Sequence, residues 1–171
     1  MSFFRIFLII FIFCTSASSN TNIPVKYIDL NFIVNESIIG KKIKSKIAAN
    51  GEKLRNEHKK LEKKLQTKKN EILAKKNVLS EEDFKKEVDK HQTNVKNYQT
   101  KKSSDLDNLN KNNLDMSKNF MVKIDKIVID YSRENSIDLL LKKEALIVSN
   151  SNLDVTKDIL NLVDKNIKKI D

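Results

Sequence analysis

The sequence contains very few of the residues that build tight turns. Among 171 residues there are two glycines, one proline and no tryptophan. Because glycine and proline supply the backbone conformations of tight turns, this composition argues against a compact globule with many short connections. The single cysteine, Cys14, lies in the N-terminal leader described next. The remainder of the chain therefore has no cysteine from which to build a disulfide or a thiol site.

The first twenty residues have the features of a secretory signal peptide. Arg5 precedes an apolar run over residues 6–13, and small polar residues follow without any acidic side chain. The run is about half of the ~20 residues that span a bilayer, so a retained membrane anchor is the less favoured alternative. We therefore expect residues 1–19 to be removed on export.

Positive charge is concentrated in the middle of the chain, where residues 41–102 hold twenty basic and nine acidic side chains, a net charge of +11. From residue 20 onward, the remaining positions hold twelve basic and fourteen acidic residues, a net charge of −2. A cationic surface of this kind attracts acidic partners. The alternative is a merely solvated surface, because twenty asparagines beside thirty lysines indicate a compositional bias.

Apolar residues in the basic region recur at intervals of three, four and seven, which predicts two helices that pack along narrow seams. The first seam consists of Ile47, Leu54, Leu61, Leu65 and Ile72. The second consists of Phe84, Val88, His91, Val95, Tyr98, Leu106, Leu109, Met116, Phe120, Ile124, Ile127 and Tyr131. Ser80 followed by Asp83 predicts the start of the second helix, so the chain should reverse near residue 79. Residues 41–131 are thus expected to form an antiparallel coiled-coil hairpin.

The sequences on both sides of this hairpin predict a small β-rich body made of residues 20–40 and 132–171. Residues 25–30 alternate as in a strand, residues 137–141 and 145–148 suggest a β-hairpin, and Asp154 can cap a final helix. The fold class is therefore α+β, mostly α. A three-stranded body buries too little apolar surface and leaves open edges, so we expect it to oligomerise. The residues expected at that interface are Val25, Tyr27, Leu139, Leu141, Leu146 and Val148.

Two segments at opposite ends of the chain resemble the Skp/OmpH family of periplasmic chaperones: "VKYIDLNFIVNESIIGKKIKSKI" (25–47) and "IDLLLKKEALIVSNSNLDVTKDILNLVD" (137–164). The resemblance implies a periplasmic, ATP-independent holdase. It also implies a homotrimer whose strands share one barrel and whose helical arms enclose unfolded outer-membrane proteins. The positions that match the family pattern, which we interpret as structural, are Asp29, Ser37, Gly40, Asp154 and Thr156.

No residue pattern indicates an enzyme, a cofactor or a metal site. His58 and His91 fall on the two seams without a neighbouring cysteine or His-carboxylate pattern, so we interpret them as packing residues. "IIGKKIKS" lacks the first glycine of a phosphate-binding loop, so no nucleotide cycle is expected. The lysines expected to attract acidic clients are Lys59, Lys63, Lys64, Lys68, Lys85 and Lys86, and anionic lipid is a further candidate partner.

Two other functions are compatible with a basic helical chain. A coiled-coil scaffold would need no client, but it should continue its seam unbroken, whereas this chain reverses at Ser80. A nucleic-acid-binding protein would also be basic. Export, only three arginines and the lack of clustered aromatic residues argue against nucleic acid as a partner.

Overall fold

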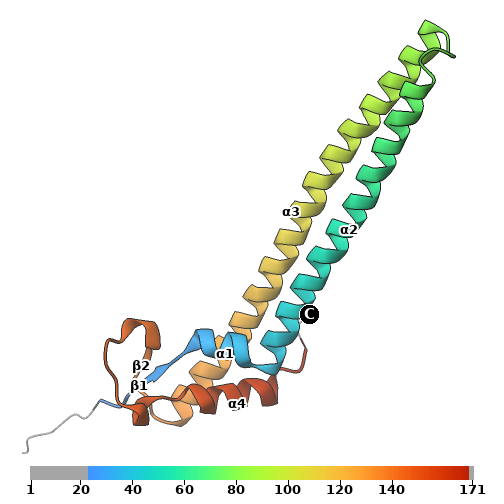
Figure 1. The fold of residues 1–171 in the computed structure, drawn as a ribbon. Helices are drawn as coiled ribbons and strands as arrows, with labels where there is room; N and C mark the ends of the chain where they lie inside the picture. Colours follow the sequence, from blue (N-terminus) through green and yellow to red (C-terminus); the bar gives the residue numbers. More distant parts are fainter. Residues whose placement is uncertain (1–22, 170–171) are drawn as a thin grey trace, which may run out of the picture.

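Two long helices run antiparallel and project as a pair of arms from a small base (Figure 1). In this computed structural model, residues 23–169 are described, and the expected signal peptide lies outside them. The elements in chain order are β1 (Val25–Ile28), α1 (Leu30–Glu36), α2 (Ile38–Ala74), α3 (Glu81–Glu134), β2 (Leu139–Lys142), the 3₁₀ turns η1 (Lys143–Ala145) and η2 (Ser151–Leu153), and α4 (Thr156–Asn166). No helix among the described residues is long and apolar enough to cross a membrane.

The chain reverses between α2 and α3 where the sequence predicts it. The Ser80 Oγ accepts a hydrogen bond of 3.1 Å from the Asp83 N–H and donates one of 2.7 Å to the Asp83 carboxylate. Glu81, Glu82 and Asp83 put three acidic side chains in the first turn, where the helix dipole favours negative charge. The 37 residues of α2 extend about 55 Å at 1.5 Å per residue, so the arm tips lie far from the base.

A short helix that the sequence analysis did not predict, α1, leads into the first arm. The Asp29 carboxylate accepts the Phe32 N–H at 2.8 Å, and this hydrogen bond, together with nearby Lys143, lowers the pKa of Asp29 despite partial burial. Ser37 ends α1, where its N–H donates to the Ile33 carbonyl, and begins α2, where its hydroxyl accepts the Gly40 N–H at 3.1 Å. One buried serine therefore fixes the angle between the two helices.

The core lies in the base and is built mainly from aliphatic side chains. Ile33 of α1, Ile124 of α3, and Ile159 and Val163 of α4 are fully buried. Phe120 is buried beside them, and Met116 and Met121 pack against the same cluster, so these residues join the hairpin to the base. Each fully buried side chain of this size contributes about 1.5–3 kcal/mol relative to exposure.

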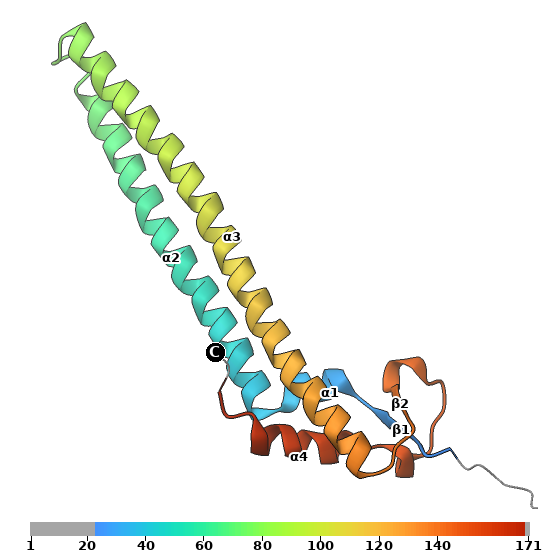
Figure 2. The same ribbon diagram turned by 180° about the vertical axis from the view of Figure 1, so that it is seen from behind.

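Helix α4 crosses the foot of the two arms, as the views from the front and from behind both show (Figures 1 and 2). The Asp29 N–H donates to the Thr156 Oγ1 at 2.9 Å, and the Ile38 N–H donates to the Asp164 carboxylate at 2.8 Å. The C-terminal helix therefore supplies polar contacts to the starts of both α1 and α2. Helix α4 begins later than expected, since Asp154 lies before its N-cap Val155, although the Asp154 carboxylate still accepts the Thr156 N–H.

The sheet differs from the expected one. β1 and β2 pair in parallel, and no β-hairpin forms, because residues 143–145 make a 3₁₀ turn and residues 146–148 form no strand. Hairpin turns favour glycine or asparagine with positive φ, which "KKE" lacks. Instead, Lys143 pairs with the Asp29 carboxylate at 3.1 Å and Glu144 accepts a hydrogen bond from Asn31, which ties the turn to α1.

Alternation along β1 is also weaker than predicted, because the two adjacent residues Tyr27 and Ile28 are both buried. Ile28 belongs to the core cluster, while Tyr27 is bridged to Asp154 on the open edge of β1. The strand is therefore covered on two sides by the chain's own base.

The two glycines of α2 predict opposite effects of the same substitution. A Cβ atom at Gly40 would overlap the Val34 carbonyl oxygen and come within 2.8 Å of the Ser37 Oγ, whereas a Cβ at Gly51 would meet no atom. Gly40→Ala should lower the free energy of unfolding by about 2–3 kcal/mol through overpacking. Gly51→Ala should raise it by about 0.5–1 kcal/mol through helix propensity. Urea unfolding of both variants checks this pair, and an unaffected Gly40→Ala protein would contradict the close packing of α1 on α2.

Candidate functional site

The expected client-binding lysines lie on two arms and do not form one cluster. Lys59, Lys63, Lys64 and Lys68 belong to α2, whereas Lys85 and Lys86 lie near the start of α3. Lys63, Lys64 and Lys68 line one face of α2 together with Lys60, Thr67 and Glu71, which we call the lysine face.

Two of these lysines are engaged in ion pairs. Lys68 lies 3.3 Å from the Glu87 carboxylate across the arms, and Lys86 lies 2.7 Å from Glu82 on the same helix. The other four, Lys59, Lys63, Lys64 and Lys85, make no ion pair or hydrogen bond with the described part of the chain. Their charge is therefore open to a partner, and at an exposed site each pair that they form contributes at most about 1 kcal/mol.

An apolar groove runs between the two arms toward their tips, on the flank of α2 that faces away from Thr67. It has a volume of about 1050 Å³ and we call it the arm groove. Its apolar lining consists of Leu65, Ile72, Leu73, Val88, Val95 and Tyr98. Leu73 is 54% exposed although it is a large aliphatic residue. Apolar periodicity did not reveal this groove, because the predicted seam includes Ile72 but not Leu73, which lies beside it and widens the apolar surface to one side.

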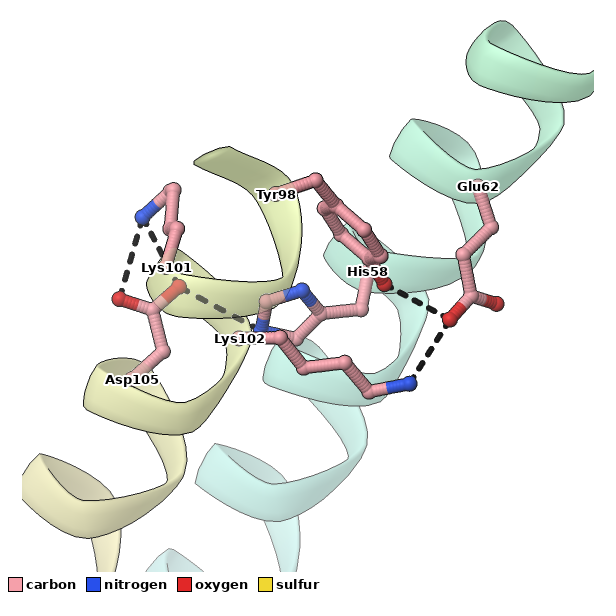
Figure 3. A network of polar contacts seen from close by, with 6 residues as sticks. All are labelled: His58, Glu62, Tyr98, Lys101, Lys102 and Asp105. Atoms are coloured by element: carbon pink, nitrogen blue, oxygen red, sulfur yellow. Dashed lines mark hydrogen bonds and ion pairs between the residues drawn. The ribbon is translucent and has the colours of Figure 1, made fainter. Parts of the chain in front are cut away.

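A network of polar side chains crosses the arms next to this groove (Figure 3). The Tyr98 hydroxyl and the Lys102 ammonium both donate to the Glu62 carboxylate, at 2.7 and 2.8 Å. These hydrogen bonds lower the pKa of Glu62, with Lys102 as the larger cause. The pKa of Tyr98 is raised by desolvation and by its bond to Glu62, and that of Lys102 is raised by the same carboxylate. The network fixes which residues of α2 and α3 lie opposite each other.

His58 is the buried member of this layer, with 5% of its surface exposed. Its Nε2 lies 3.4 Å from the Asp105 carboxylate, its ring meets that of Tyr98 edge-on, and neither ring nitrogen makes a hydrogen bond. Lys101 holds the same carboxylate at 2.8 Å. Among the described residues no group of three or more histidine, cysteine or carboxylate side chains is placed to hold a metal.

The sequence predicts Leu106 on the seam of α3, but in the structure Asp105 occupies that seam position opposite His58. Leu106 is 43% exposed, whereas Asp105 is partly buried opposite His58. The apolar pattern was misleading here because a carboxylate paired with a histidine and a lysine occupies the position that leucine would otherwise fill. The position of His58 on its own seam was the signal that a polar partner lay opposite.

The residues expected at the oligomer interface lie together only in part. Val25 is opposite Leu139 and Tyr27 is opposite Leu141 in the parallel sheet. Tyr27 is 7% exposed and already covered within the chain, whereas Val148 is 87% exposed. Leu146 is half-buried beside the fully exposed Ile147.

The described residues thus form two long antiparallel helical arms on a small mixed base. The profile of the OmpH-like outer membrane protein family matches residues 24–163, so the chain belongs to that family. A crystal structure of an OmpH-like outer membrane chaperone from Caulobacter crescentus CB15 has the same fold, with a TM-score of 0.81. The two chains share 16% identity over 86% of this chain and 88% of the other. A search of curated protein sequences finds no significant match.

The buried His58 generates a prediction about arm stability. His58→Leu removes two ring nitrogens that lack hydrogen bonds and adds aliphatic contact beside Leu54 and Leu109, so it should raise the free energy of unfolding by about 1–2 kcal/mol. Asn94→Leu, on an exposed face of α3, serves as the control and should change stability by less than about 0.5 kcal/mol. Thermal unfolding followed by circular dichroism measures both. If His58→Leu instead lowers stability, the contact of His58 with Asp105 contributes more free energy than the burial of its two ring nitrogens costs.

Proposed function

We propose that the chain is an ATP-independent periplasmic chaperone that holds unfolded outer-membrane proteins between cationic helical arms and delays their aggregation. The observation that carries the proposal is the pair of arms itself, which contains the helix α2 of about 55 Å and bears the +11 charge of residues 41–102. Membership of the OmpH-like family and the chaperone of the same fold from Caulobacter crescentus support it.

The mechanism needs no catalytic group. Positive charge on the arms attracts acidic unfolded chains over a Debye length of about 8–10 Å, and apolar arm residues then make many weak contacts. Such contacts are individually weak, so a client that begins to fold leaves without an energy source. The protein is therefore not an enzyme in this proposal, and it binds no cofactor.

We further propose that the protein works as an oligomer, of which a homotrimer is the form implied by the family resemblance. A two-stranded sheet has only marginal stability on its own. Leu139 in β2, and Ile147 and Val148 after it in the chain, also expose large apolar side chains. A second and a third copy would cover these residues and place three pairs of arms around one cavity.

The oligomer predicts a specific effect of charge in residues 146–148. Ile147→Asp combined with Val148→Asp should leave the helical circular dichroism signal intact, because both side chains are exposed, but should yield monomers in sedimentation velocity. Val78→Asp combined with Leu114→Asp is the matched control, since both residues are exposed, Val78 in the turn between α2 and α3 and Leu114 on α3. An assembly that survives the first change as well as the second would contradict the proposed interface.

Charge reversal on the arms tests the chaperone function. One variant changes to Glu four of the arm lysines that make no ion pair: Lys59, Lys63, Lys64 and Lys85. The matched control changes four lysines outside residues 41–102 that also make no polar side-chain contact with the described residues: Lys126, Lys142, Lys157 and Lys165. An acidic unfolded outer-membrane protein is diluted from denaturant, and its light scattering is followed without nucleotide.

The wild-type protein and the control variant should suppress scattering, whereas the arm variant should need several-fold more protein for equal suppression at low salt. The difference should shrink as the ionic strength rises, because salt screens exposed charges. Circular dichroism and sedimentation first establish that both variants keep their helix content and assembly. If the wild-type chain does not suppress aggregation, the proposed function is wrong, and if both variants match it, the arm charge is only a solvated surface.

A further inference from the structure

The arm groove lies apart from the lysine face, and this separation indicates two different roles on one arm. Gln66 lines the groove, whereas Thr67, the next residue of α2, lies on the lysine face, and both are exposed. One flank of the arm therefore offers buried and half-buried apolar side chains, and the other offers mainly ammonium groups.

The groove carries its own positive charge at its borders. Lys69 of α2 and Lys96 of α3 line it from the two arms, and the ammonium group of neither makes an ion pair or hydrogen bond within the described residues. Lys102 also lines the groove, but its ammonium is held by Glu62. An occupant that complements this surface has apolar side chains on one side and carboxylates near its edges.

The dimensions of the groove suit a short extended segment. Its lining on α2 runs from Glu62 to Leu73, which is about 16 Å at 1.5 Å per residue. An extended chain covers that length with about five residues at 3.3 Å per residue. In such a segment every second side chain points to the same side, so two or three apolar side chains can enter the groove together.

We propose that the arm groove binds extended segments of unfolded outer-membrane β-strands, with their lipid-facing side chains in the groove and acidic flanking residues at Lys69 and Lys96. This inference rests on the proposed function and adds to it the binding surface and the conformation of the client. Strands of outer-membrane barrels alternate apolar and polar residues with a period of two, which gives them the one-sided apolar pattern that the groove requires. The lysine face then attracts the client, and the groove retains it.

Site-specific cross-linking tests the inference at two adjacent positions. The full chain carries Cys14→Ser, so that Gln66→Cys or Thr67→Cys provides its only cysteine. Each variant is exported, purified, labelled with a benzophenone maleimide and irradiated with an unfolded outer-membrane protein diluted from denaturant. Gln66→Cys should cross-link to the client at least fivefold more than Thr67→Cys, although the two labels lie at the same height on the arm.

A second comparison tests the contribution of the groove to affinity. Leu73→Gln changes an exposed leucine in the groove, and Leu114→Gln makes the same change at an exposed leucine of α3 outside it. The first should weaken binding of the unfolded client by about threefold or more, and the second should leave binding unchanged.

The outcomes separate this inference from the proposed function. If aggregation is suppressed but the client cross-links equally at both positions or preferentially at Thr67→Cys, the groove is not the binding surface while the chaperone function stands. If irradiation joins two copies of the chain at Gln66→Cys and excludes the client, the groove is an interface between copies, and the inference is wrong. Absence of both cross-linking and aggregation suppression would reject the proposed function itself.

Discussion

The packing of aliphatic side chains in the base is the interaction on which the whole structure depends. Ile33, Ile124, Ile159 and Val163 come from three helices that are distant in sequence, and all four are fully buried. Because α4 lies across the foot of the arms, the chain is closed at the base by its own C-terminal helix (Figure 2). Hydrogen bonds from the Asp29 and Ile38 amides to α4 orient this helix relative to α1 and α2.

The arms, in contrast, bury little beyond a narrow seam. After Ile43, helix α2 leaves the base. From there to its end, His58 and Ile72 are its only buried residues within the described chain. A helix pair of this kind keeps its register through polar pairs such as Glu62 with Tyr98 and Lys68 with Glu87, and it leaves apolar side chains such as Leu73 accessible. Because the arms bury little apolar area, their own packing contributes little stability. The apolar area that stays exposed is available for contact with a partner.

Local signals in the sequence predicted the features that depend on neighbouring residues. Ser80 with three following acids identified the reversal of the chain, and the spacing of Val155, Ile159 and Val163 identified the buried face of α4. Asp29, Ser37 and Thr156 match the family pattern and were interpreted as structural without a specific role. In the structure Asp29 and Ser37 are helix caps, and Thr156 makes a contact between helices.

Features that depend on contacts distant in sequence were not predictable in the same way. Residues 145–148 have a strand-like composition, yet strand formation needs a partner edge, and the turn at 143–145 directs them away from β2. Asp105 could not be recognised as a seam residue from apolar periodicity, because its burial depends on His58 from the other arm. The arm groove likewise arises only when the flanks of two helices are placed side by side.

Native-state hydrogen exchange across the two arms tests most directly the claim that one small core in the base holds the molecule together. Protection reports local opening, so it should decrease along each arm with distance from the buried cluster. The amides of Ile124 and Ile159 should exchange slowest, and those of residues 65–72 and 88–98 should exchange at least tenfold faster. Equal protection of the tips and the base would contradict the account, because it would mean that the seam of the arms, and not the base, provides the cooperative core.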